Sequence, residues 1–145
     1  MIPLHVIDAV GDFTLSAIDV WSPGTDILSL LMDLVAHGQC GAFTKLNFLT
    51  GKGDKCRSIN IRERVSVIGR EKCQGLIDFH NFTGADWGGK CVGISKKSWV
   101  TSYLSLSNDD SIVSAFQRLG ERVLTSHELV DGELPEEVRP IEKFV

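Results

Sequence analysis

The run Phe13-Thr-Leu-Ser-Ala-Ile-Asp-Val-Trp21 alternates in part and is rich in β-forming residues, which predicts a buried strand. Residues 22–25 (Ser-Pro-Gly-Thr) form a turn, and Thr25 or Asp26 can begin the next helix. That helix is expected over residues 26–37, where apolar residues occupy most faces, and Gly38 ends it. A strand, a tight turn and a helix form the opening of an α/β unit, in which ligands gather at the carboxyl ends of the strands.

The segments around this unit extend the same architecture. Residues 2–10 predict a helix that ends at Gly11, and residues 43–50 predict a second strand. A flexible hairpin tip over 51–55 leads to a third strand over 57–61, and a short helix then runs to Val67 and closes at Gly69. We therefore expect an α/β fold with a short, partly parallel sheet flanked by helices over residues 1–69.

Residues 70–145 predict a mainly helical half. Helices are expected over 71–82, 96–105, 111–119 and 125–130, with the cap of the third supplied by residues 108–111, and Pro135 begins a further segment. The first of these helices places Cys73, Leu76, Ile77 and His80 on one stripe. No N-cap precedes residues 2–10, and the chain stops within the apolar run 141–145, so we expect a single domain that is truncated at both ends.

Composition and charge limit the function classes. The chain has 145 residues and 43% hydrophobic content, which is typical of a globular domain, and no apolar run approaches the length of a membrane span. Four scattered cysteines without Cys-x-x-Cys spacing argue against a zinc knuckle and favour reduced thiols, hence an intracellular protein, nuclear or cytoplasmic. Residues 45–105 carry eleven bases and five acids between acidic flanks, which indicates either a nucleic-acid groove or chance clustering on solvated faces.

The segment from Gly84 to Trp99 combines the residue types that a phosphate-binding site needs. Glycines allow a close approach of the backbone to a ligand, and the amides at a helix N-terminus favour anions. Lys96 and Lys97 open the predicted helix and add positive charge, and Asp86 can hold a hard cation through its oxygens. A cation beside a turn that grips phosphate is what a nuclease acting on phosphodiesters requires.

This segment resembles the helix–turn–helix of flap-endonuclease-like nucleases of the PIN-domain superfamily. Their pattern is Gly-Cys-Asp-Tyr, a spacer and then Gly-Ile-Gly-x-Lys. The matching positions here are Gly84, Asp86, Trp87 for the tyrosine, Gly93, Ile94 and Lys97, with Ser95 in place of a glycine.

Two further runs carry the same resemblance. Residues 22–31 are similar to the Ser-Pro-Asp-Thr-Asp-Val-Leu-x-Leu-Leu run of divergent, transposon-associated members, with Gly24 in place of the first acid. The upstream match includes Leu76, His80 and Thr83. The likeness spans roughly residues 1–145 as an internal segment of a larger domain, and it is closest at 22–31 and 76–97.

The resemblance implies a site with carboxylates that bind two Mg²⁺ or Mn²⁺ ions and a turn that holds the phosphate backbone of nucleic acid, with DNA favoured over RNA. Carried over by position, Asp26 and Asp86 are the catalytic and metal-ligand candidates. The phosphate-contact candidates are Lys90, Gly93, Ser95, Lys96 and Lys97, and the 93–97 turn is a candidate K⁺ site. Because Gly24 and Ser95 depart from the pattern and earlier family carboxylates have no counterpart, the implied nuclease is catalytically impaired.

Two other function classes remain open at this stage. One is a nucleic-acid-binding module without catalysis, in which Trp87 or Trp99 could stack on bases, although core packing is the commoner role of such tryptophans. The other is a protein-interaction or relict fragment of a mobile-element-derived protein, with a protein partner bound through the acidic C-terminal region. Steep salt dependence of DNA binding separates the first class from the second.

Overall fold

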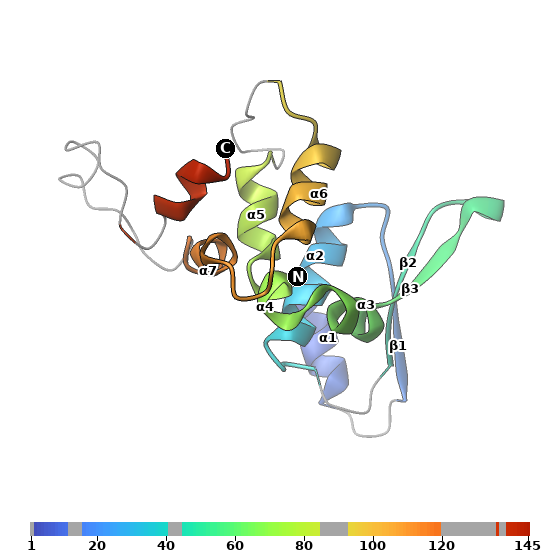
Figure 1. Cartoon of the computed structure of the whole chain (residues 1–145). Helices are drawn as coiled ribbons and strands as arrows, with labels where there is room; N and C mark the ends of the chain where they lie inside the picture. The colour runs from blue at the N-terminus through green and yellow to red at the C-terminus, as the bar shows by residue number, and fades with distance from the viewer. Residues whose placement is uncertain (1, 12–15, 41–44, 85–92, 120–135, 137–138) are drawn as a thin grey trace, which may run out of the picture. The chain divides into compact units, whose positions relative to one another are not determined.

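The computed structural model describes residues 2–11, 16–40, 45–84, 93–119, 136 and 139–145 (Figure 1). The chain divides into two compact units, Met1–Gln74 and Gly75–Val145, which are described separately below. The first unit contains the sheet, and all described elements of the second are helical. This confirms the predicted α/β class with a mainly helical second half.

The sheet of the first unit has three strands in the order β1-β2-β3. The strands are β1 (Ala17–Trp21), β2 (Lys45–Thr50) and β3 (Arg57–Asn60). β1 pairs with β2 in parallel, and β2 pairs with β3 in antiparallel orientation. The predicted partly parallel sheet is therefore confirmed, although the described strands are shorter than expected; residues 13–15, 43 and 44 lie outside the described residues.

Four α-helices in the described part of the first unit accompany this sheet. The first three had been expected at these places, and the fourth covers the beginning of the helix predicted over residues 71–82. They are α1 (Ile2–Val10), α2 (Thr25–Ala36), α3 (Ile61–Ile68) and α4 (Arg70–Gln74). Local signals set their ends: the Asn60 side chain accepts a hydrogen bond from the Glu63 amide at the start of α3, and Gly69 with φ +101° ends it.

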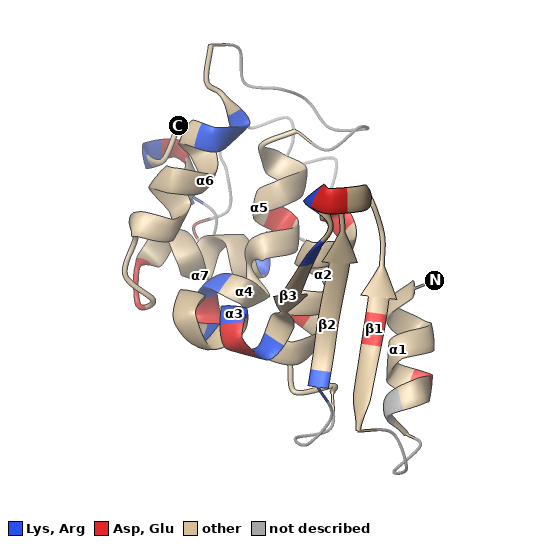
Figure 2. Ribbon diagram, turned by 90° about the vertical axis from the view of Figure 1, so that its right-hand side faces the viewer, with Lys and Arg blue, Asp and Glu red and all other residues tan. Residues whose placement is uncertain are grey.

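Only one face of the sheet is buried. Leu46 and Phe48 of β2 are 1% and 2% exposed and face the helical layer, with α2 behind the sheet in Figure 2. On the alternate positions of β1, Asp19 is exposed and Trp21 is 58% exposed. The sheet therefore has one apolar face and one polar face, as expected for strands of period two with helices on one side.

The described part of the second unit packs three α-helices and a terminal 3₁₀ turn around an aromatic core. Its elements are α5 (Leu76–Phe82), α6 (Lys96–Ser105), α7 (Ser111–Arg118) and η2 (Arg139–Lys143). Its fully buried rings include Phe79, Tyr103 and Phe116. Asp110 caps α7 by accepting a hydrogen bond from the Ile112 amide at 2.8 Å, as the sequence indicated. The expected helix over 125–130 and the segment beginning at Pro135 lie outside the described residues.

The prediction of one continuous helix over residues 71–82 is wrong. The chain forms α4 and α5 instead, with Gly75 between them, and the division into units falls at this point. A Cβ at Gly75 would lie 2.8 Å from Tyr103 Oη, so the backbone here is set by close contact with the core of the second unit. The buried residue of α5 is Phe79, whereas His80 is only partly buried, so the predicted stripe is also corrected.

Candidate nucleic-acid interface

The predicted phosphate-binding turn lies directly before α6 in the second unit. Gly93 is exposed and has φ +95°, and a Cβ added there would meet no atom within 4 Å. Ser95 is the N-cap of α6, and its Oγ accepts a hydrogen bond from the Ser98 amide at 3.1 Å. The turn is thus positioned by its own cap, and the glycine before it supplies the left-handed backbone that other residues rarely adopt.

Lys96 and Lys97 are the first two residues of α6, and both are exposed. The amides of the first helical turn have no acceptor within the helix, and the macrodipole is positive at this end. No acidic residue lies in the first turn of α6. Two lysines at this end are unfavourable for the dipole of α6, so the stability of α6 does not explain their position. An anionic ligand, by contrast, would be attracted by the amides of the first turn and by the lysines.

Lys96 also contacts the end of α5. Its Nζ lies 3.5 Å from His80 Nε2 and donates a hydrogen bond to the Gly84 carbonyl oxygen at 3.4 Å. A cation at the carboxyl end of a helix is favourable, so this contact holds the Lys96 ammonium in place. The His80–Lys96 contact could not be predicted from the sequence, because it depends on tertiary structure.

The carboxylate candidates are described only in part. Asp26 is exposed in the first turn of α2, where a negative charge favours the helix dipole. Asp86 and Lys90 lie outside the described residues. In the described part of the chain, His, Cys, Asp and Glu form no group of three or more that could hold a metal ion. Asp26 alone does not make up a Mg²⁺ or Mn²⁺ site, and the two-carboxylate site stays a prediction.

The two described tryptophans differ in exposure. Trp99 is 3% exposed and belongs to the aromatic core of the second unit, which confirms core packing as its role and excludes the alternative of a stacking platform. Trp87 lies outside the described residues. Trp21, which the sequence placed in a buried strand, is 58% exposed because it points to the uncovered face of the sheet.

The three described thiols lie in different environments. Burial raises the pKa of Cys73 to about 11, with the charges of Asp33 and Glu71 adding to the effect. Burial also raises the pKa of Cys40, and Arg62 partly offsets the rise. Cys56 is free and exposed. Because metals bind the thiolate, raised pKa values make Cys40 and Cys73 poor ligands at neutral pH.

The basic middle of the sequence is divided between the two units. Eight of its eleven cations precede Gly75, and the other three are Lys90, Lys96 and Lys97. In the first unit, Lys and Arg alternate with acidic residues along α3, α4 and the hairpin tip (Figure 2). Lys72 is 8% exposed and therefore contributes little to a surface. The cations of the 93–97 turn form a separate, smaller group.

No protein-family model, curated protein or solved structure matches the chain. The likeness to flap-type nucleases therefore rests on the quoted motifs alone. Among the residues that the structure describes, no helix has both the length and the apolar character needed to cross a lipid bilayer.

Proposed function

We propose that this chain is a divergent, catalytically impaired nuclease-like domain that binds the phosphate backbone of nucleic acid, DNA in the first instance, inside the cell. The observation that supports it is the turn before α6. An exposed glycine at φ +95°, a capped helix start and two exposed lysines meet there without a neighbouring acid in the first helical turn. Backbone amides and mobile cations are the groups that proteins use to hold phosphates without reading sequence.

The two lysines have distinct roles in this proposal. Lys96 is held by His80 and the Gly84 carbonyl, so its charge is positioned before the ligand arrives. Lys97 is exposed and supplies a second cation one residue further along α6. A pre-positioned cation loses less entropy on binding than a free one, so Lys96 contributes to orientation and Lys97 to general attraction.

Catalysis is the weaker part of the proposal. Gly24 stands where the resemblance calls for a carboxylate, and Ser95 stands where it calls for a glycine. The Ser95 hydroxyl already serves the cap of α6, which leaves it less free to contact phosphate. We therefore assign phosphate binding to the turn, leave Mg²⁺ or Mn²⁺ chemistry with Asp26 and Asp86 as a hypothesis, and derive no step through a metal.

The test measures DNA binding as a function of salt. Labelled single-stranded, branched and duplex DNA, with RNA of the same sequence, would be titrated with the chain in potassium and in sodium buffers. The double variant Lys96→Gln/Lys97→Gln should lower the slope of log K against log salt by about 1.5, since each phosphate contact contributes about 0.7 to 0.9. Lys52→Gln, a change at an exposed lysine of the hairpin tip in the first unit, is the matched control and should leave the slope unchanged.

The same samples would be followed for cutting with and without manganese. Manganese-dependent cutting that disappears in both Asp26→Asn and Asp86→Asn would show an active nuclease and overturn the claim of impairment. Salt-dependent binding without cutting would support the proposal. If the folded chain binds neither DNA nor RNA at low salt, the proposal fails and the protein-interaction or relict hypothesis remains. A preference for potassium over sodium would support the K⁺ site at the turn.

A further inference from the structure

The outer edge of β1 offers unused backbone hydrogen-bonding groups. β1 is an end strand of the sheet, and its even-numbered residues bond to β2: Ser16 O accepts from the Lys45 amide, and the Ser22 amide donates to Leu49 O, both at 3.0 Å. Successive residues of a strand direct their N–H and C=O groups to opposite edges. The groups of Ala17, Asp19 and Trp21 therefore point away from β2, and they bond to no other described residue.

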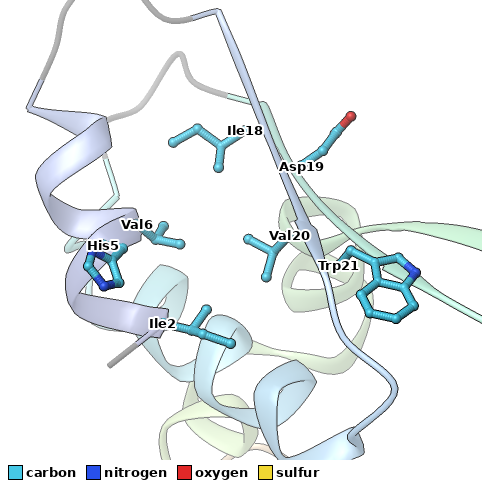
Figure 3. Close-up of a pocket in the computed structure, with 7 residues that line it drawn as sticks. All are labelled: Ile2, His5, Val6, Ile18, Asp19, Val20 and Trp21. Atoms are coloured by element: carbon cyan, nitrogen blue, oxygen red, sulfur yellow. The ribbon is translucent and has the colours of Figure 1, made fainter.

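A groove runs along this edge, between β1 and α1. It encloses about 310 Å³ and is lined by Ile2, His5, Val6, Ile18, Asp19, Val20 and Trp21. Figure 3 shows Ile2, Val6, Ile18 and Val20 directed into the space between the helix and the strand, while Asp19 and Trp21 project from the other face. Since Asp19 and Trp21 line the groove although their side chains point away, the groove opens onto the backbone of the strand.

The helix and the strand that line the groove carry Asp8 and Asp19 and no Lys or Arg, whereas Lys45 of the neighbouring β2 is paired with Ala17. Residues 1–44 contain five aspartates and no lysine or arginine. Asp8 on α1 and Asp19 on β1 are both exposed. Asp19 accepts a hydrogen bond from Asn47 Nδ2 at 2.8 Å, and this bond keeps the carboxylate on the open face of the sheet. A ligand at this edge would meet negative potential without competing cations on α1 or β1.

We propose that the free edge of β1 binds an extended peptide with alternating apolar and basic residues, by strand addition. Residues that lie opposite one another on neighbouring strands form rows across the sheet. The polarity of these rows determines which residues of the peptide should be apolar and which should be basic. On the buried face the row Val20–Phe48–Ile59 is apolar, so an added strand would direct apolar side chains into the groove. On the open face the row Asp19–Asn47–Asn60 is polar, so Lys or Arg would stand opposite Asp19.

Trp21 strengthens the preference for a basic residue. Its ring is 58% exposed and lies two residues from Asp19 on the same open face. A lysine or arginine side chain that pairs with the carboxylate can also pack over the indole, a cation–π contact that neutral side chains lack. Main-chain hydrogen bonds then provide the affinity of the peptide for β1, and its alternate side chains provide the specificity, as in other cases of strand addition.

A second copy of this chain fits the edge poorly. Pairing of two β1 edges would bring Asp19 and Asp8 of one copy toward the same residues of the other, and no Lys or Arg in residues 1–44 would offset the repulsion. A basic partner peptide relieves this repulsion. The residues of this surface belong to the first unit, whereas the 93–97 turn belongs to the second.

The test uses the full chain and a synthetic peptide of alternating Lys and Val, about seven residues long and capped at both ends. Amide hydrogen exchange, resolved by residue, is followed as the peptide is added. The amides of Ala17, Asp19 and Trp21 should become protected, whereas those of Ile18 and Val20 should be protected already. A Glu–Val peptide and a Lys–Val peptide with a central proline should each bind at least about tenfold more weakly.

Ala17→Pro removes one outward amide without removing a bond to β2, because proline is tolerated where an edge N–H faces solvent. We expect it to weaken peptide binding about tenfold, while Ala17→Val, the matched control, does not. If Ala17→Pro fails to fold, the proline peptide gives the same information on the native chain. Binding without protection of the odd-numbered amides would overturn the proposal. So would protection that appears without peptide and rises with protein concentration, since a second copy would then occupy the edge.

Discussion

The ring of Tyr103 is stacked on the ring of Phe79, with centroids 4.3 Å apart and planes 15° from parallel. Phe116 meets both rings edge-on, at centroid distances of 5.4 and 5.6 Å. The hydroxyl of Tyr103 reaches the backbone at Gly75, where an added Cβ would lie 2.8 Å from it. The aromatic core of the second unit therefore fixes the residue at which α5 can begin.

Gly75→Ala should lower the free energy of unfolding by about 1–3 kcal/mol, the usual range for overpacking. The added methyl would meet Tyr103 Oη, and also Phe116 Cβ at 3.2 Å and the Gln117 backbone nitrogen at 3.3 Å. Alanine readily adopts the φ of −90° found at Gly75. A loss of stability would therefore report on the close contacts alone. Urea unfolding followed by circular dichroism measures the change.

Gly24→Ala is the matched control for this prediction. Its φ of −88° is similar, and the nearest atom to an added Cβ is Ser22 Oγ at an ordinary 3.7 Å. Because Gly24 is the N-cap of α2, where glycine is preferred to alanine, the change should cost about 0.5 kcal/mol, less than at Gly75. Equal effects at Gly24 and Gly75 would contradict the crowding at Gly75.

Ser95→Ala should destabilise the second unit by about 1 kcal/mol, because the Ser98 amide loses its acceptor at the start of α6. Ser95→Asn keeps an acceptor and should cost much less. The thermal unfolding midpoints of both variants distinguish the effect of losing the cap hydrogen bond from the effect of losing a polar side chain. An asparagine variant as unstable as the alanine variant would show that the cap contributes little.

Cysteine labelling should separate the described thiols by their accessibility and pKa. In a Cys91→Ser background, a maleimide at pH 8 should modify the exposed Cys56 quickly. Cys73, with a pKa of about 11 and no exposed surface, is only about one-thousandth thiolate at that pH and should react through unfolding. Peptide mapping by mass spectrometry assigns the rates. Fast labelling of Cys73 in the folded chain would refute its burial against α2.

Asp33→Asn should raise the free energy of unfolding at pH 7. Burial raises the pKa of the Asp33 carboxyl, and the His37 charge and hydrogen bond lower it by less. A raised pKa contributes stability that is fully present below the ordinary value of 3.8 and is lost as the pH rises through the folded value. At pH 7 the ionised carboxylate is therefore a cost, which the neutral asparagine removes while it still offers His37 an acceptor.

The pH dependence makes this prediction specific. The difference between Asp33→Asn and the native chain in urea unfolding should shrink as the pH falls toward 3.8, where Asp33 becomes protonated. Asp54→Asn, at an exposed position in the hairpin tip, serves as the control. A variant that is less stable than the native chain at pH 7 would show that the ion pair with His37, at 3.0 Å, outweighs the cost of burial.

Much of the fold follows from local signals in the sequence. Gly38 and Gly69 end helices with positive φ, Asp110 caps α7, and the β-forming runs become β1 and β2. The break at Gly75 was not predictable, because helix propensity tolerates one glycine and only the position of Tyr103 demands it. In the same way, periodicity alone gave no reason to prefer Phe79 over His80 as the buried residue of α5.

The residue types of the candidate site could be predicted from the sequence, but their arrangement in space could not. Residue types placed two cations at the start of α6, and both are found there, whereas the cap at Ser95 had not been predicted. The contact of Lys96 with His80 depends on tertiary structure, as does the division of the basic middle between two units. No sequence motif predicts the groove beside β1. The groove results from the position of β1 at the end of the described sheet, where alternate residues are exposed.

The parallel pairing of β1 with β2 also has a consequence for the order of folding. Asp19 and Asn47 are bonded across 28 residues, whereas β2 and β3 are joined by a short hairpin. Closing the longer loop costs more entropy, so the hairpin should form first and β1 should join after α2 has formed. During synthesis, β1 leaves the ribosome before its partner exists, and its apolar side chains, Ile18 and Val20, stay uncovered until β2 has emerged.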